Sequence, residues 1–251
     1  MLKIILSGCN GQMGKVITEV AKEDKDVEIT AGVDISGEQL SDYPVYKDIN
    51  DFEGEADAII DFSKPAALPN IIKYCEKTKT PAVLAATGYS DEELEAIKEL
   101  GTKAPVLFSR NMSLGINVML ELLKKAAASL PGFDVEIVER HHNKKVDSPS
   151  GTAFMLANAV NEAKDNSLEF IYGREGNDTK RKENELAIHA VRGGTIVGEH
   201  DVLFAGLDEL IEIKHTALSK KVFANGSINA AKFMAKQPVG LYDMSDMFSA
   251  E

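Results

Sequence analysis

Short apolar runs alternate with helical stretches through the first half of the chain. Strands are predicted at 3–6, 27–33, 58–62, 81–86 and 106–108. Helices are predicted between them at 15–22, 66–77 and 90–100. Ser90 and Glu93 form a capping-box pattern that opens the last of these helices. Strands that alternate with helices predict right-handed crossovers and a parallel sheet covered on both faces.

The second half has a different pattern. A long amphipathic helix is predicted at 118–130, and a strand at 133–139 and a helix at 152–163 follow it. Further strands are predicted at 168–172, 186–191, 195–197, 202–205 and 210–216. A solvated loop is predicted at 174–185. A last helix is predicted near 222–235 and is placed to dock on the first half. The pattern therefore predicts an α/β protein with two domains. The first is a Rossmann-type domain with a parallel sheet, and the second is an α+β domain with a mixed or antiparallel sheet.

Charge restricts the partners of this protein. Its 251 residues include 40 acidic and 28 basic side chains, which give a net charge of −12. Because such a field repels phosphate on average, we expect neither nucleic acid nor an anionic membrane as a partner. An anionic ligand needs a local cluster of cations.

Cysteine content and hydrophobic runs indicate the compartment. Cys9 and Cys75 are too few for a disulfide framework, and neither lies in a metal-ligand spacing. The apolar start of the chain is too short for the core of a signal peptide, and no run of 18 apolar residues is present. We therefore expect a cytoplasmic protein.

The turn between the first predicted strand and helix reads Gly8-Cys9-Asn10-Gly11-Gln12-Met13-Gly14. Glycines in such a turn let the backbone approach a pyrophosphate, whose charge is met by the N–H groups of the helix N-terminus. Asp34, which ends the second strand, is placed to bind an adenosine ribose. The spacing is GxxGxxG rather than the commoner GxGxxG, so the context carries the prediction of a dinucleotide site. The alternative is a tight turn and an unrelated acidic residue.

The residue after Asp34 bears on the choice between NADH and NADPH. It is Ile35, where NADP sites usually have Arg or Lys to meet the 2′-phosphate. This position favours NADH, although a cation from elsewhere, such as Lys64, could restore the use of NADPH.

Two further loops follow predicted strands. Thr87-Gly88 comes after the fourth strand and 109–112 after the fifth. In an open parallel sheet such loops form the ligand crevice, although Gly, Ser and Asn are also ordinary loop residues.

The densest chemistry lies at 139–152, between a strand end and a helix start. Arg140, His141, His142, Lys144 and Lys145 fall within six residues of a strongly acidic chain, as an anionic substrate would require. The following Ser-Gly-Thr at 150–152 opens a helix, where hydroxyls and N–H groups can hold a carboxylate. His and Lys can also transfer protons near neutral pH. The alternative is a solvated basic loop followed by a capping serine.

A metal site is not expected. On an extended segment His141 and His142 point to opposite sides, and no Cys or carboxylate lies nearby at a ligand spacing. Nucleophilic catalysis is also disfavoured, because no GxSxG turn is present.

The segment HHNKKVDSPSGTA, residues 141–153, resembles the signature of the dihydrodipicolinate reductase family of lysine biosynthesis. The similarity runs over nearly the whole chain, and its other motifs lie at 61–65, 86–88, 111–115, 173–176, 192–195, 198–200 and 240–244. The resemblance implies the NAD(P)H-dependent reduction of 4-hydroxy-tetrahydrodipicolinate to tetrahydrodipicolinate with loss of water, in the diaminopimelate route.

The resemblance also implies roles for single residues. His141 corresponds to the proton donor and acceptor, and Lys145 to a second proton donor. His142, Gly151 and Thr152 would hold the carboxylates of the small dicarboxylate substrate. The residues that would line the dinucleotide are Gly8, Cys9, Asn10, Gly11, Gln12, Met13, Asp34, Ala85, Ala86, Thr87, Ser109, Arg110, Asn111 and Met112.

Domain boundaries and assembly follow from the same resemblance. It implies a dinucleotide-binding domain of residues 1–112 and 220–251, and a substrate-binding domain of residues 113–219 that forms a homotetramer through its sheet. Two departures stand out: Asn143 and Lys144 replace Arg or His of many relatives, and Ala85-Ala86 replaces a Gly-Thr pair.

Two other functions remain open from the residues alone. One keeps the dinucleotide domain but reduces a different small imino or oxo dicarboxylate. The other is a non-catalytic dinucleotide sensor, which would give no reason for the cluster of His141, His142 and Lys145.

Overall fold

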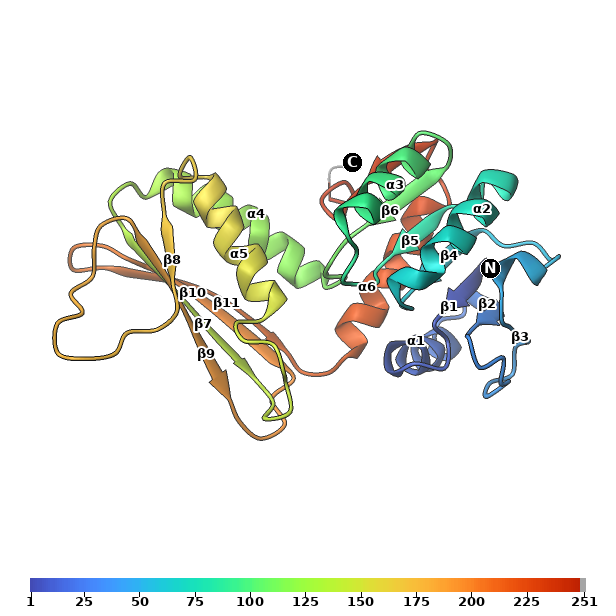
Figure 1. Ribbon diagram of the computed structural model, residues 1–251, viewed down its shortest axis with the longest axis horizontal. Helices are drawn as coiled ribbons and strands as arrows, with labels where there is room; N and C mark the ends of the chain where they lie inside the picture. The colour runs from blue at the N-terminus through green and yellow to red at the C-terminus, as the bar shows by residue number, and fades with distance from the viewer. Residues whose placement is uncertain (249–251) are drawn as a thin grey trace. The chain divides into compact units, whose positions relative to one another are not determined.

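A computed structural model describes residues 1–248 of the protein (Figure 1). The chain forms two compact units. One unit combines Met1–Leu114 with the chain from Lys220 onward, and the other is Gly115–Ser219. Residues 249–251, which belong to the segment 220–251 assigned above to the dinucleotide domain, lie outside the described residues.

The first unit contains a seven-stranded sheet in the order β12-β6-β5-β4-β1-β2-β3, with every pair parallel. Its strands are β1 (Leu2–Ser7), β2 (Val27–Val33), β3 (Val45–Tyr46), β4 (Ala58–Asp61), β5 (Ala82–Leu84), β6 (Pro105–Phe108) and β12 (Gly240–Tyr242). The strand order reverses between β1 and β4, and in open α/β sheets ligands bind at the carboxyl ends of the strands beside such a reversal. The Rossmann-type parallel sheet predicted from the sequence is confirmed.

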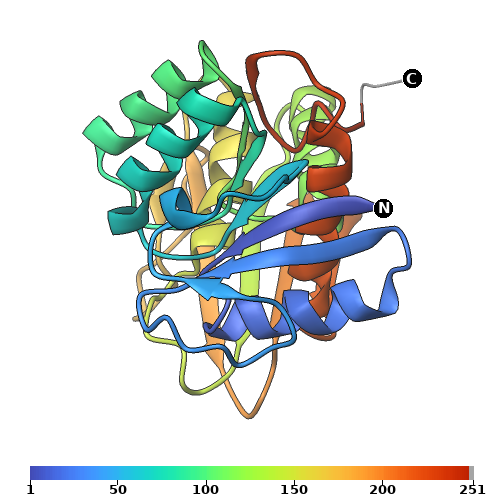
Figure 2. The ribbon, with the colours of Figure 1, turned by 90° about the vertical axis from the view of Figure 1, so that its right-hand side faces the viewer.

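Helices cover both faces of this sheet (Figure 2). Ile4 and Leu6 of β1 pack in one cluster with α1 (Gln12–Glu23) and α6 (Lys221–Met234), whereas Ile5 packs in another with α2 (Leu68–Thr78) and α3 (Asp91–Gly101). Successive side chains of a strand point to opposite faces, so a continuous apolar run is needed where both faces are buried. The predicted capping box of Ser90 and Glu93 is present at the start of α3.

The C-terminal helix α6 returns to the first unit, as its apolar pattern suggested. Ala224, Ile228 and Met234 lie in the same core cluster as α1. Lys232 Nζ also lies 2.6 Å from Asp24 Oδ2, just beyond the end of α1. Hydrogen bonding from Lys232 lowers the pKa of Asp24 below its ordinary value.

The second unit contains a five-stranded mixed sheet in the order β11-β10-β7-β9-β8. Its strands are β7 (Asp134–His141), β8 (Glu169–Ile171), β9 (Glu185–Arg192), β10 (Gly198–Ala205) and β11 (Leu210–Ala217). β7 is antiparallel to β10 and parallel to β9. The helices α4 (Leu114–Ser129) and α5 (Gly151–Glu162) pack on one face, where their apolar residues meet Val135, Ile137 and Phe204.

The structure corrects some predicted elements. Residues 195–197 form no strand, since a turn at 194–195 is followed by irregular chain, and β10 runs unbroken from Gly198 to Ala205. The short edge strands β3 and β12 were not predicted, because two or three residues carry too little periodicity. The predicted loop 174–185 is irregular up to Asn184, where β9 follows.

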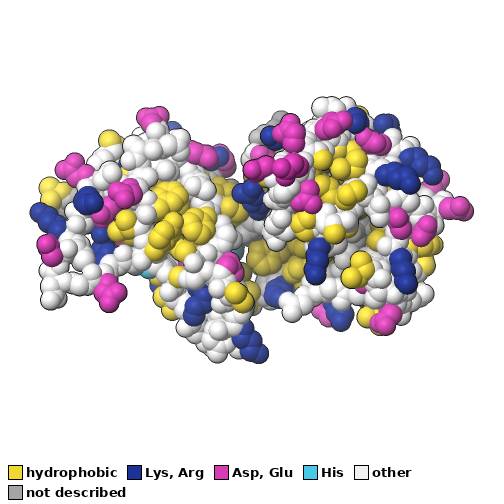
Figure 3. Space-filling model, viewed as in Figure 1, with side chains coloured by type: hydrophobic (Ala, Val, Ile, Leu, Met, Phe, Trp, Pro, Cys, Tyr) yellow, Lys and Arg dark blue, Asp and Glu magenta, His cyan; other side chains and the backbone are white. Residues whose placement is uncertain are grey.

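Charged side chains of both signs are interspersed on the face that Figure 3 shows. Within the described residues, the structure contains no helix that combines the length and the apolar character needed to cross a membrane.

Candidate active site

The turn after β1 has the shape of an anion cradle. Gly8 has a φ of +78°, and a Cβ atom there would lie 2.9 Å from backbone atoms of Phe62 and Ser63. A Cβ at Gly14 would overlap the carbonyl oxygens of Gly8 and Cys9. Gly11 is the N-cap of α1 and provides no side-chain cap, so the first N–H groups of α1 have no partner from a capping side chain. These residues fit the pyrophosphate of a dinucleotide.

Asp34 lies beside this turn, immediately after β2. Its Oδ1 accepts hydrogen bonds from the N–H of Ser36 (3.0 Å) and from Ser36 Oγ (2.9 Å). Asn10 Nδ2 donates to Ser36 Oγ (3.0 Å) and to the carbonyl oxygen of Glu38 (2.9 Å). The glycine turn and the loop after Asp34 are therefore joined by direct hydrogen bonds.

A cavity of about 410 Å³ opens at this edge of the sheet. Gly8, Gly11, Asp34 and Ile35 line it, together with two lysines, Lys47 and Lys64. Lys64 is the cation expected from the sequence as a partner for a 2′-phosphate, whereas no sequence pattern pointed to Lys47.

The other predicted cofactor residues lie at the same edge without lining this cavity. Ala85, Ala86 and Thr87 follow β5, and residues 109–112 follow β6. Ser109 Oγ donates to the carbonyl oxygen of Asn111 (2.9 Å), so these two residues shape their own loop. The side chain of Cys9 is buried in the core, which leaves only its backbone near the turn.

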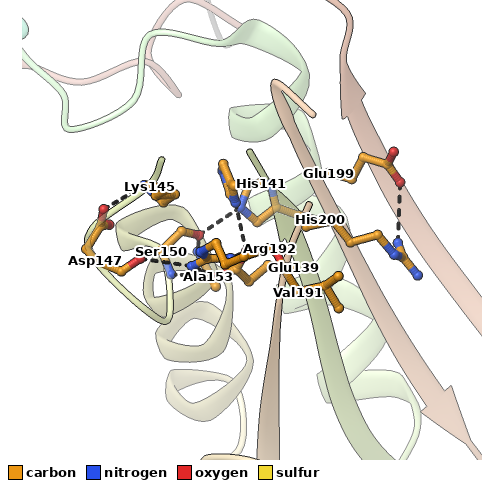
Figure 4. A network of polar contacts seen from close by, with 11 residues as sticks. Glu139, His141, Lys145, Asp147, Ser150, Ala153, Val191, Arg192, Glu199 and His200 are labelled. Carbon is orange, nitrogen blue, oxygen red and sulfur yellow. Dashed lines mark hydrogen bonds and ion pairs between the residues drawn. The ribbon is translucent and has the colours of Figure 1, made fainter. Parts of the chain in front are cut away.

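In the second unit, a buried polar network occupies one end of the helix-covered sheet face (Figure 4). At its centre is Glu139 of β7, which has no exposed surface. Both of its carboxylate oxygens lie 2.7 Å from Arg192 of β9, through Nη1 and Nη2. Oε2 also lies 2.7 Å from His141 Nδ1, and Oε1 accepts the N–H of Ser150 at 2.9 Å.

Ser150 connects this network to the start of α5. Its Oγ accepts the N–H of Ala153 (3.1 Å) as the N-cap of the helix. The same oxygen lies 3.0 Å from His200 Nε2 of β10. The Ser150 hydroxyl, expected from the sequence to be open to a carboxylate, is thus used inside the protein. Gly151 and Thr152 form the first turn of α5 beyond it.

Burial sets the protonation of the two site histidines. It lowers the pKa of His141 below the ordinary 6.5, and the hydrogen bond that Nδ1 donates to Glu139 opposes this only in part. For His200, burial and the neighbouring His141 ring lower the pKa to about 3. The two rings meet edge to face with centroids 5.2 Å apart. Burial also raises the pKa of Glu139, but hydrogen bonds from Arg192, His141 and Ser150 outweigh this and leave it below its ordinary value.

The loop after β7 carries the remaining predicted residues. Lys145 Nζ lies 2.9 Å from Asp147 Oδ1, and His142, three residues before Lys145, is half-buried. Arg192 Nη2 donates to the carbonyl oxygen of Asp147 (2.9 Å), which ties this loop to the network. The structure therefore gathers His141, Lys145 and the start of α5 at one end of the sheet.

The connecting residues Glu139, Arg192 and His200 had no role assigned from the sequence. Glu139 lies two positions before His141 on a strand, so the period of two places both side chains on the same face of the sheet. Arg192 and His200 fall in family-like motifs but in distant strands, so no local pattern assigned them to this site. Among the described residues, no group of three or more His, Cys, Asp or Glu side chains could hold a metal ion.

Two family models match the chain. Residues 2–112 match the model described as dihydrodipicolinate reductase, N-terminus, and residues 115–248 match dihydrodipicolinate reductase, C-terminus.

Curated relatives match over nearly their full length. The 4-hydroxy-tetrahydrodipicolinate reductase of Caldanaerobacter subterraneus subsp. tengcongensis is 52% identical over 247 residues, which are 98% of each chain. The enzyme of the same name from Clostridium tetani is 50% identical and covers 100% of this chain and 98% of its own length. Among solved structures, the dipicolinate-bound dihydrodipicolinate reductase from Paenisporosarcina sp. TG-14 has a TM-score of 0.81 at 23% identity and covers 97% of both chains, which shows a shared fold.

The low pKa of His200 predicts a specific acid sensitivity. In the unfolded chain this histidine titrates near its ordinary 6.5, whereas in the folded protein its pKa is about 3. The folded state therefore binds fewer protons, so its stability is full above pH 6.5 and falls as the pH drops towards 3. His200→Gln, which can keep a polar contact to Ser150 without titrating, should lower the slope of unfolding free energy against pH by about 1.4 kcal/mol per pH unit. Urea unfolding of both proteins between about pH 6.5 and pH 4.5 measures this slope, and parallel curves would contradict the assignment.

Proposed function

The chain belongs to the dihydrodipicolinate reductase family, and we propose which of its residues perform each part of that family's reaction. The enzyme is an oxidoreductase that reduces 4-hydroxy-tetrahydrodipicolinate to tetrahydrodipicolinate with loss of water, in the diaminopimelate route of lysine biosynthesis. The observation that carries this function is the match to reductases about half identical over essentially the whole chain, both units included.

His141 and Lys145 are the proposed proton-transfer residues. When bound, the reduced nicotinamide cofactor supplies a hydride to the ring carbon. The net reaction also consumes one proton, and the hydroxyl leaves as water, so the site needs groups that can both accept and donate protons. His141, with a lowered pKa, is unprotonated at neutral pH in the free protein and can accept a proton at Nε2. Lys145 provides a cationic donor in the adjoining loop.

The substrate carboxylates are proposed to bind at the start of α5. Gly151 and Thr152 lie in its first turn, where the helix dipole favours negative charge. His142 adds a polar side chain from the loop after β7. The reductase from Paenisporosarcina sp. TG-14, which has a similar fold, was solved with bound dipicolinate, a planar dicarboxylate. Its ligand supports a dicarboxylate substrate here.

A test of this assignment is Lys145→Ala in the full-length enzyme. Loss of a positioned proton donor should lower kcat by about 100-fold or more, while cofactor binding is unchanged. Oxidation of NADH or NADPH is followed by absorbance, with the substrate generated in place from pyruvate and aspartate semialdehyde by the preceding synthase. Lys144→Ala, which removes an exposed cation from the same loop, is the matched control and should retain kcat. Full turnover in Lys145→Ala would exclude the donor role, and no turnover in the unaltered enzyme would contradict the function itself.

For the cofactor, we propose a preference for NADH over NADPH. The carboxylate of Asp34 can bond the hydroxyls of the adenosine ribose but repels a 2′-phosphate, and Ile35 adds no cation. Lys47 and Lys64, which line the same cavity, supply the positive charge that lets NADPH bind as the weaker cofactor.

Asp34→Ala should therefore change the ratio of the two cofactors. We expect kcat/KM with NADH to fall about tenfold, which is the loss of roughly 1.4 kcal/mol of charge-assisted hydrogen bonding, and kcat/KM with NADPH to fall less. Lys64→Ala is the reciprocal variant and should lower kcat/KM with NADPH alone. Equal losses for both cofactors in Asp34→Ala would contradict the role of the carboxylate.

A homotetramer is proposed to form through the sheet of the second unit. α4 and α5 cover one face of this sheet, and Val191 and Leu210 are 43% and 53% exposed on the other. Apolar side chains on an uncovered sheet face favour self-association.

The assembly predicts a particle four times the mass of the 27.2 kDa chain in light scattering after size-exclusion chromatography. Leu210→Lys, which places a charge on the uncovered face without touching the core, should shift the mass to smaller species. A monomeric unaltered protein at micromolar concentration would contradict the proposal.

A further inference from the structure

We propose that Glu139 is a positioning residue, which holds His141 in the tautomer that carries its proton on Nδ1 and leaves Nε2 to the substrate. Arg192 and the Ser150 backbone hold Glu139 in place for this task. The inference rests on the proposed proton-transfer role of His141 and adds a residue that acts through it.

The contacts of Glu139 are saturated. Its two oxygens receive two contacts from Arg192, one from His141 Nδ1 and one from the N–H of Ser150, at distances of 2.7 to 2.9 Å. An ionised carboxylate offers about four acceptor sites, so every one is used. These partners come from β7, β9 and the start of α5, so the carboxylate cannot rotate without breaking contacts to two other elements.

The tautomer follows from this arrangement. Arg192 and a backbone N–H can only donate, and they keep Glu139 ionised and therefore purely an acceptor. Nδ1 of His141, 2.7 Å away, must then be the donor. In the neutral ring the lone pair lies on Nε2. Glu139 is fully buried, whereas 11% of the His141 side chain remains exposed.

Arg192 limits how strongly Glu139 charges the ring. A bare buried carboxylate would stabilise imidazolium, but the bidentate contact from Arg192 neutralises it. The charged and titratable groups that face His141 or this pair from the packed elements are Glu139, Lys145, Asp147, Arg192 and His200. The result is an oriented histidine that stays neutral until substrate binds.

Imidazole nitrogen chemical shifts in the unaltered enzyme test the tautomer directly. A two-bond proton–nitrogen correlation spectrum of the ¹⁵N-labelled protein distinguishes the two ring nitrogens, and His141→Asn identifies the signals of residue 141. A proton on Nδ1 above the pKa of His141 is expected. A proton on Nε2 would overturn the proposal, whatever the activity of the enzyme.

Glu139→Gln tests the consequence for the reaction. We expect kcat to fall about 100-fold with little change in KM for the dicarboxylate, because the misoriented ring loses its proton-transfer contribution. The positive charge of Arg192 also becomes uncompensated, which disfavours a second positive charge on His141. The limb of the plot of kcat/KM against pH that reports the pKa of His141 should therefore move to lower pH. Wild-type kcat and an unmoved limb would refute the positioning role.

The same strand offers a matched control. Glu136, on the opposite face of β7, also contacts a histidine and arginines: His189 Nε2 at 2.8 Å, Arg174 Nη2 at 2.9 Å and Arg181 Nε at 3.3 Å. Glu136→Gln breaks an equivalent cluster away from His141, and it should leave kcat, the pH limb and the His141 tautomer unchanged at unchanged assembly mass. The same losses in this variant would show a structural effect and reject the proposal.

Glu139→Asp covers the case in which the glutamine variant does not fold. It keeps the negative charge against Arg192 but withdraws the oxygens by one methylene. The pH limb should stay near its wild-type position while kcat falls, and a limb displaced as far as expected for glutamine would contradict the proposal. His141→Asn with full activity would instead reject the proposed role of His141, and the tautomer measurement would still decide whether Glu139 orients the ring.

Discussion

The second unit depends on a buried carboxylate that stays ionised. Glu139 has no exposed surface, and the cost of burying its charge is met only because Arg192, His141 and Ser150 all donate to it. Removing one partner of a buried ion pair lowers the free energy of unfolding by about 3 to 5 kcal/mol. The need to keep every donor on the Glu139 carboxylate therefore holds β7, β9 and the start of α5 together. The same requirement fixes the orientation of the proposed proton-transfer histidine. Stability and chemistry therefore share one interaction.

The first unit depends on a different constraint, the parallel direction of its strands. All carboxyl ends lie at one edge, so the turn after β1 and the loop after β2 are neighbours although they are distant in sequence. Asn10 joins them through Ser36, beside Asp34. The cavity proposed to bind the dinucleotide is thus a consequence of sheet topology, and the proposed preference for NADH rests on three side chains that line it, Asp34, Lys47 and Lys64.

Features with a local signal in the chain could be predicted from the sequence. Short apolar runs such as Ile4-Ile5-Leu6 alternate with helical segments, and this alternation predicted the parallel sheet. The capping box of Ser90 and Glu93 was also predicted, and it is present. Distant pairings could not be predicted, and the contact of Glu139 with Arg192 joins residues 53 positions apart. The Ser150 hydroxyl was favoured as part of the ligand site over the alternative of a capping serine, because the sequence did not reveal His200 as a further partner. Of the two lysines that line the cavity, only Lys64 could be predicted from the sequence. Lys47 follows a strand of two residues, which is too short to predict.

The two proposed anion sites use helix N-termini in opposite ways. α1 begins at Gly11, which gives no side-chain cap, and glycines keep the space in front of it clear, as a bulky pyrophosphate requires. α5 begins at Ser150, whose hydroxyl caps the helix and whose backbone N–H is bound by Glu139. A capped and anchored helix start has less freedom to move, so its first turn is fixed relative to His141, which Glu139 also binds. A reacting dicarboxylate must be held at a defined distance from the group that exchanges its protons, whereas the pyrophosphate of the cofactor takes no part in the chemical step. The two N-caps suit this difference between the proposed tasks.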